Sequence, residues 1–169
     1  MAIGSSAMCG TFKKEILAGI HRLTSSSRGD SSSISADTFK VAMFTNSASI
    51  DADTAQYTTS NEVSGTNYTA GGAALSSVTI GLGDNSSGVP TAFVDFADTT
   101  FSSSTISSAR GALIYNSTLS GASTGSTVTA LANPSVAVIN FDADKSSSAG
   151  DFTIQYPANN ANAAIIRIA

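Results

Sequence analysis

The stretch FVDFADTTFSSSTISSARGALIYN, residues 93–116, contains two apolar runs, a serine-rich bridge between them, and one arginine, Arg110, just before the second run. Short apolar runs bounded by polar residues are typical of β-strands. Alternation in the first run places Asp95 on the same face as Phe93. Because a carboxylate beside buried apolar surface needs a partner, we expect Asp95 and Arg110 to form a structural pair between neighbouring strands.

The chain after residue 36 repeats this pattern of short apolar runs separated by turn-forming residues. Residues 39–44 are largely apolar on both faces, which is typical of a central strand. No helical periodicity intervenes, so we expect a mainly β fold, an antiparallel β-sandwich or jelly-roll-like domain over residues 37–169. The expected strands are DTFKVAMF, ALSSVTIGL, TAFVDFA, GALIYN, SVAVINF, DFTIQY and AAIIRIA.

One segment near the N-terminus predicts a helix. In TFKKEILAGIHRL, residues 11–23, apolar side chains recur at helical spacing and form one stripe, which consists of Phe12, Ile16, Ile20 and Leu23. A serine-rich linker follows, so residues 1–36 are expected to form an N-terminal arm with a short helix. The stripe is a candidate partner interface with a neighbouring subunit, although it could equally pack on the chain's own domain.

Composition narrows the classes of function. The 169 residues carry a formal net charge of −4, and only 12% of them are charged. The eight Lys and Arg are scattered, which argues against nucleic acid and anionic membranes as partners. Cys9 is the only cysteine, so no internal disulfide is expected. Without a signal-like segment or a long apolar run, we expect folding in a cytoplasm.

No group of residues predicts catalysis, a cofactor or a metal site. His21 is the only histidine, which leaves no second one for a two-histidine zinc site, and a position at a helix end explains it better. The pairs Asp51 with Asp53 and Asp142 with Asp144 lack the rest of a calcium loop, so turn-forming roles are expected. We therefore expect no catalytic, cofactor-binding or metal-binding residues.

Several segments together resemble a family of virion structural proteins of tailed bacteriophages. The segments that carry this resemblance are FKKEILAGIH, KVAMF of residues 40–44, NYTAGG of residues 67–72, RGALIYN of residues 110–116 and DFTIQYP of residues 151–157. They span nearly the whole chain in the family's order. The stretch between Leu119 and Ser135 is longer than the family pattern.

The resemblance implies a non-enzymatic virion protein assembled in the bacterial host cytoplasm. The expected role is a capsid decoration or cement protein that bridges capsid subunits. Its expected partners are the major capsid protein or other virion proteins, and copies of itself in a homo-oligomer. One alternative is a tail component, such as a tail-tube, adaptor or fibre-associated protein. Another is a β-sandwich that binds host-surface carbohydrate, with Tyr57, Tyr68 and Tyr115 as stacking faces.

Overall fold

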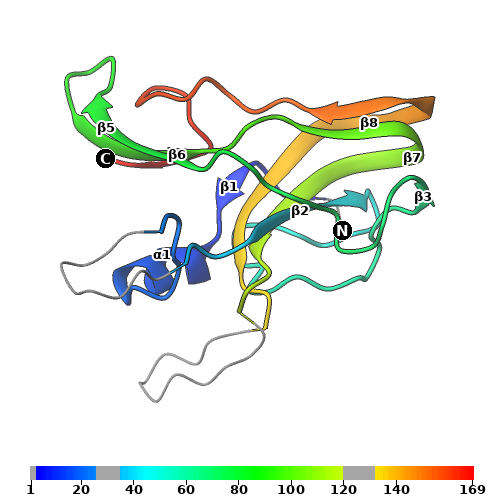
Figure 1. Cartoon of the computed structure of the whole chain (residues 1–169), viewed down its shortest axis with the longest axis horizontal. Coiled ribbons are helices and arrows are strands. Elements are labelled where there is room, and N and C mark those ends of the chain that lie inside the picture. The colour runs from blue at the N-terminus through cyan, green and yellow to red at the C-terminus, as the bar shows by residue number, and fades with distance from the viewer. Residues whose placement is uncertain (1–2, 26–34, 120–131) are drawn as a thin grey trace.

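The computed structural model describes residues 3–25, 35–119 and 132–169, and its fold is mainly β with antiparallel sheets (Figure 1). The expectation of a β-sandwich-like fold with one short N-terminal helix is confirmed. In chain order the described elements are β1 (Ala7–Met8), α1 (Gly10–Leu17), β2 (Phe39–Thr45), β3 (Gly65–Thr66), β4 (Ala73–Ala74), β5 (Thr79–Asp84), β6 (Pro90–Asp95), β7 (Thr99–Asn116), β8 (Ser135–Ile154) and β9 (Ile166–Ile168).

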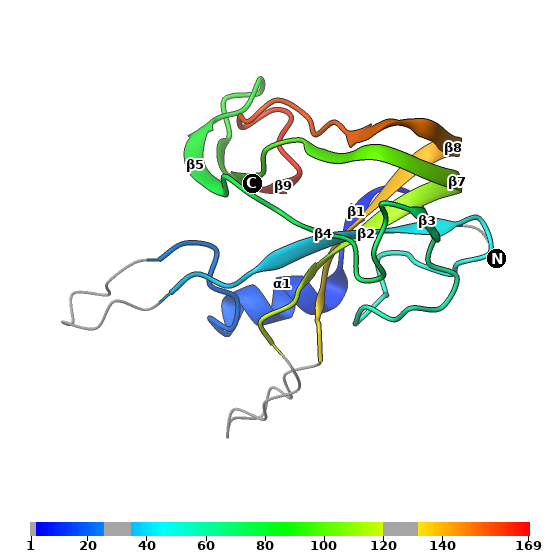
Figure 2. The same cartoon turned by 45° about the vertical axis from the view of Figure 1, so that its right-hand side comes forward.

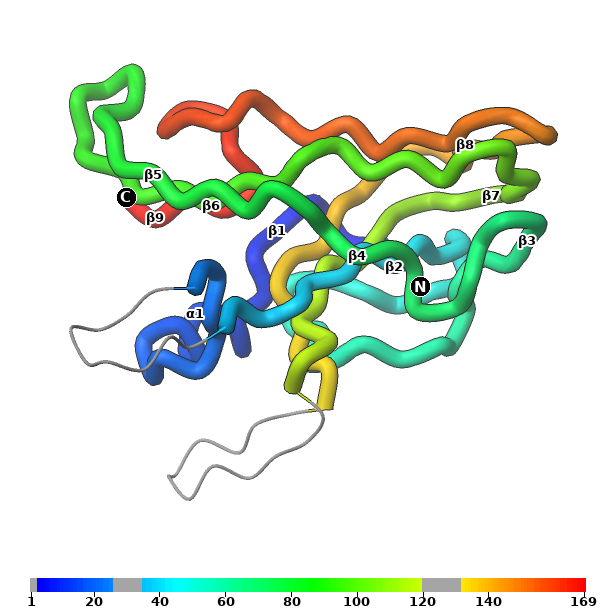
Figure 3. Tube along the Cα trace, in the orientation of Figure 1, coloured from blue at the N-terminus to red at the C-terminus, as the bar shows by residue number. Residues whose placement is uncertain are grey.

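A long two-stranded ribbon of β7 and β8 forms the frame of the molecule. The strands pair antiparallel from Thr99 opposite Ile154 to Tyr115 opposite Ser135. The ribbon folds back on itself. The rings of Phe141 and Phe152, both in β8, show this reversal, since they lie only 6.3 Å apart. Eleven residues of straight strand would separate them by roughly 36 Å. The tube in Figure 3 shows this reversal at one end of the molecule.

Irregularities in the pairing make the reversal possible. The register between β7 and β8 shifts at several points between Phe101 and Gly111. Four non-glycine residues of the ribbon have positive φ, namely Ser103, Ser108, Asp142 and Ala149. An extra residue on one strand bends that strand and increases its twist. The serine-rich bridge is therefore part of β7, and the expected strands SVAVINF and DFTIQY are joined in β8.

The ribbon connects two sheets. The larger sheet has the order β1-β8-β7-β2-β4, with β3 added to β7 beyond the end of β2. The smaller sheet has the order β5-β6-β9, and the chain passes from β6 almost directly into β7. Figures 1 and 2 place the smaller sheet and α1 at one end of the molecule and the reversal of the ribbon at the other.

The core lies over the middle of the larger sheet. The expectation of a central strand over residues 39–44 is confirmed, since β2 pairs with β7 on one side and β4 on the other. Its residues from Val41 to Phe44 are buried on both faces. Opposite them, Ala112, Leu113 and Ile114 of β7 are also buried. Apolar burial of this kind contributes about 25 cal/mol per Å² and holds the sheet together.

The N-terminal segment packs on the same core instead of projecting as an arm. The helix is shorter than the expected residues 11–23, because Gly19 adopts a φ of 68° after its last turn. The amides of Gly19 and Ile20 bond back to Ile16 and Glu15, which closes the helix in a Schellman motif. None of the described helices is long and apolar enough to cross a membrane.

The expected partner stripe is divided by this packing. Phe12 is fully buried within its own chain, so it is not available to a neighbouring subunit. Ile16 and Leu23 are partly buried against the same core, and Ile20 is half-buried. The stripe therefore docks α1 onto its own domain, which is the second of the two expected possibilities. Leu17, outside the stripe, is 89% exposed.

Candidate association surface

The tyrosines singled out in the sequence point inwards and form a network with Glu62. The hydroxyls of Tyr57 and Tyr68 donate to the two carboxylate oxygens of Glu62 at 2.5 and 2.6 Å. The amide of Gly71 donates to the same carboxylate at 2.8 Å, and Tyr115 donates to the Gly71 carbonyl at 2.7 Å. The rings of Tyr57 and Tyr115 stack on each other at 4.4 Å. These faces are occupied within the chain, which leaves none of the three rings as an open stacking platform.

His21 belongs to a second internal network. Its Nδ1 accepts from the side-chain amide of Asn116 at 3.0 Å, so its Nε2 carries the proton and donates to Glu15 at 2.7 Å. Asn116 also donates to Asp37 at 2.7 Å. The His21 side chain is fully buried, and burial lowers its pKa from 6.5. The expected position of His21 at a helix end is wrong, because α1 stops at Leu17, four residues before it.

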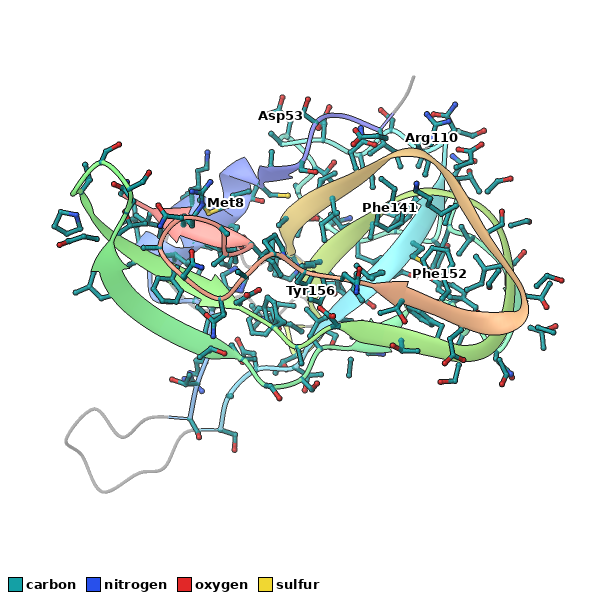
Figure 4. The ribbon with its side chains drawn as sticks, turned by 90° about the horizontal axis from the view of Figure 1, so that it is seen from above. Met8, Asp53, Arg110, Phe141, Phe152 and Tyr156 are labelled. Carbon is teal, nitrogen blue, oxygen red and sulfur yellow. The ribbon has the colours of Figure 1, made fainter. Side chains whose placement is uncertain are left out.

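The expected pair of Asp95 and Arg110 does not form. Arg110 Nε donates to Asp144 at 2.7 Å on the outside of the ribbon, and Figure 4 shows Arg110 beside the bent β8. Asp95 is buried at the end of β6, where it accepts from the backbone amide of Phe96. Burial raises its pKa. Backbone amides therefore replace the expected arginine as the partner of this carboxylate.

The remaining candidates have structural explanations. Asp51 accepts from the amide of Asp53 in a turn, as expected. Asp142 lies at a bulge of β8 and Asp144 pairs with Arg110. The pKa of Cys9 is raised to about 12 by burial, which leaves its thiol protonated and unreactive. Within the described residues, no group of three or more His, Cys, Asp or Glu could hold a metal ion.

One face of the smaller sheet exposes large apolar side chains. Leu82 of β5 lies opposite Ala92 of β6, and Ala92 lies opposite Ile168 of β9. Directly opposite residues in antiparallel strands point to the same face, so these three form a row across the sheet. Leu82 is 75% exposed and Ile168 48% exposed, and Ala92 is also exposed. Ile80, two residues before Leu82 and on the same face, is 49% exposed.

The other side chains of this face are covered by the core. Val94 lies opposite both Ile80 and Ile166, and Val94 and Ile166 are buried. Packing within the chain therefore buries part of this apolar face, and the rest of it is exposed. We call the bare part, Ile80, Leu82, Ala92 and Ile168, the apolar row.

A groove between β9 and α1 extends the apolar row. It has a volume of about 350 Å³, and its lining residues are Met8, Lys13, Ile16, Leu17, Arg167, Ile168 and Ala169. Ile168 belongs to both the groove and the row, which makes the two continuous. Leu17 at the rim of the groove is the most exposed large apolar side chain of the described residues. Together, the apolar row and this groove form the candidate association surface.

Charge is placed unevenly around this surface. Asp84 shares the face of Ile80 and Leu82, since it follows them at a spacing of two residues in β5. Lys13 of α1 lines the groove, which meets the apolar row at Ile168, two strands away from β5. Neither has an ion-pair partner within the part of the chain that the structure describes. The surface is therefore acidic at one end, basic at the other and apolar between.

The opposite face of β5 is covered within the chain. The ring of Phe93 occupies the space over Gly81, where an added Cβ would lie 2.2 Å from the ring. An added Cβ at Gly83 would touch Ala161, and the amide of Ser86 donates to Asn162 at 2.6 Å. The segment before β9 therefore covers the glycine side of β5.

Two further hollows lie along β8 and are less distinctive. One of about 490 Å³ lies beside Phe141 and Phe152, and one of about 430 Å³ lies beside Met8 and Tyr156. Figure 4 shows Met8, Tyr156 and Phe152 in succession along this side. Neither hollow combines a strongly exposed apolar side chain with charges at its ends.

Sequence reasoning missed the candidate association surface, although TIGLGD in β5 carried a signal. Apolar and glycine residues alternate there, which separates a large-residue face from a face with no side chains.

Searches among known protein families, curated proteins and solved structures found no match to the chain.

Proposed function

We propose that this chain is a non-enzymatic structural protein of a bacteriophage particle, most specifically a capsid decoration or cement protein. The proposal starts from the resemblance of KVAMF, NYTAGG, RGALIYN and DFTIQYP to virion structural proteins of tailed phages. In this role the protein binds the major capsid protein or other virion proteins and is present in many copies on the particle.

The observation that carries the proposal is the candidate association surface. Large exposed apolar side chains that lie side by side mark sites of contact with other proteins. Leu17 and Ile168 line one groove, and Leu82 lies two strands from Ile168 in the same sheet; all three are exposed. A protein whose work is assembly needs such a surface and needs no catalytic centre.

The amino-acid composition of the chain supports the same role. Ser, Thr, Asn and Gly replace many of the usual charges, since only 12% of the residues are charged. Contact surfaces of proteins are depleted in charged residues at their centres, because burying ions is costly. A weakly charged surface therefore suits broad contact with a capsid.

Co-sedimentation with particle parts tests the proposal. Labelled protein is mixed with tailless heads and, separately, with tails, both purified from particles that lack it. We expect saturable binding to heads at a copy number on the scale of the capsid subunits. Binding to tails alone would replace the decoration role with a tail role. Binding to neither, by protein shown to be folded, would overturn a structural role in the virion.

A further inference from the structure

We infer that the candidate association surface binds a second copy of this chain about a two-fold axis. This inference deepens the proposed function, on which it rests in treating the protein as a subunit that assembles. It adds the identity of one partner, the symmetry of the contact and the residues that make it.

The arrangement of charge suits a second copy. A two-fold contact brings the same patch of both subunits together in opposite directions. Because Asp84 lies at one end of the patch and Lys13 at the other, reversal places each Asp84 beside the Lys13 of the second copy. Both charges lack an ion-pair partner among the described residues, so both are free to make this contact.

The shape of the patch is self-complementary in the same direction. Leu82 protrudes at the acidic end, where 75% of it is exposed, and the groove of about 350 Å³ lies at the basic end. Adjacent strands are about 4.8 Å apart, so Leu82 lies roughly 10 Å from Ile168 across the row. A two-fold axis between Ala92 and Ile168 directs each Leu82 towards the groove of the second copy.

Other partners would fit the charged and apolar side chains of the candidate association surface less well. An anionic lipid surface would be repelled by Asp84, and the groove offers it only the scattered cations Lys13 and Arg167. A foreign protein would have to present an apolar ridge with a cation at one end and an anion at the other. The chain itself supplies that pattern.

Self-association of the purified full-length chain is the first test. Sedimentation equilibrium is expected to show a reversible monomer–dimer equilibrium with a Kd in the range of about 1–100 µM. Leu82→Asp is expected to weaken the dimer at least about tenfold, equivalent to about 1.4 kcal/mol. Ser87→Asp adds the same charge in the turn after β5 and is the matched control.

Charge reversal tests the two-fold geometry directly. Asp84→Lys alone and Lys13→Asp alone should each weaken self-association, because each homodimer then contains two contacts between like charges. A mixture of the two variants should associate as well as the wild type, since both contacts in the mixed dimer join opposite charges. Asp142→Lys, at the far bend of β8, changes the charge equally without touching the surface. Melting temperatures establish that all variants are folded.

The outcomes separate this inference from the proposed function. A wild-type chain that is monomeric at about 1 mM, a concentration at which even weak specific contacts form, would overturn the inference. So would a mixture of the two charge variants that fails to associate. Binding to heads by a strictly monomeric chain would leave the decoration role intact. A dimer that binds neither heads nor tails would retain the two-fold contact and remove the virion role.

Discussion

Replacing Glu62 tests whether one carboxylate holds the loop between β2 and β4 onto the larger sheet. Glu62 accepts hydrogen bonds from two tyrosine hydroxyls and one backbone amide, all at 2.8 Å or less. A hydrogen bond to a charged group contributes roughly 1.5–3 kcal/mol to stability. Because Glu62 is half-buried, water can replace part of the loss, so we expect Glu62→Leu to cost about 3–5 kcal/mol and Glu62→Gln about 2 kcal/mol.

Urea denaturation measures this cost as a lower midpoint with an unchanged slope. Heating provides a second measurement, in which Glu62→Leu should lower the melting temperature by about 10 °C for a chain of this size. Asp53→Asn removes an exposed carboxylate from the same loop and should change stability by less than about 0.5 kcal/mol.

A double-mutant cycle assigns the loss to the network. Tyr57→Phe and Glu62→Leu remove the two ends of the 2.5 Å hydrogen bond. Their combined effect should differ from the sum of the single effects by at least about 0.5 kcal/mol, as contacting residues usually show. A cost below about 1 kcal/mol for Glu62→Leu, or strict additivity in the cycle, would refute the reasoning.

Four further predictions follow from named contacts. The pKa values of all four tyrosines are raised, chiefly by burial, with Tyr115 and Tyr156 at about 12. Phenolate absorbance should therefore be absent near pH 10 and appear with alkaline unfolding, because the unfolded chain loses these protons first and stability falls as the pH rises past 10. The single His21 should titrate below 6.5 in proton NMR, and stability should fall as the pH drops below 6.5, because the unfolded state takes up that proton first. Arg110→Met should cost less than about 1 kcal/mol in urea denaturation, since its pair with Asp144 is partly exposed. Gly72→Ala should cost at least about 3 kcal/mol, because its Cβ would lie 1.8 Å from the Val41 carbonyl oxygen, whereas Gly88→Ala, with a similar positive φ and open space, should cost about 1 kcal/mol.

The central strand could be predicted from the sequence because its signal is local. FKVAMF is largely apolar on both faces, and a strand of that kind is typical of a position between two neighbours in a covered sheet. The structure places it there, with residues from Val41 to Phe44 buried. The helix could be predicted for the same reason, except for its end, where the positive φ of Gly19 stops it two turns early.

The serine-rich part of the ribbon could not be predicted because its signal is not local. Residues 102–108 have the composition of a loop, yet they pair with β8. Hydroxyl groups supply part of the pairing at the bulges, since Ser104 and Ser147 bond to each other at 2.8 Å and the amide of Ile106 donates to Ser147. Strand formation there depends on a partner some 40 residues away, which composition does not reveal.

The prediction that Arg110 pairs with Asp95 was wrong for a related reason. Alternation correctly placed Asp95 beside apolar surface, but it could not show which strand Arg110 faces. Ala109 lies opposite Lys145 in β8, so the arginine reaches Asp144 and not β6. Register between distant strands is set by bulges and turns, and the bulges of this ribbon lie in its least distinctive sequence.

The glycines of β5 explain why the candidate association surface lies on one side of the smaller sheet. Gly81 leaves room for the ring of Phe93, and Gly83 for Ala161, so the glycine side is completed within the chain. The alternate positions carry Ile80 and Leu82, which are 49% and 75% exposed. Full burial of a leucine or isoleucine side chain is worth about 1.5–3 kcal/mol, and packing among the described residues does not gain that free energy for Leu82. Leu82→Ser should therefore leave the stability of the isolated domain nearly unchanged while it weakens association, whereas a leucine that packed within the domain would show the opposite balance.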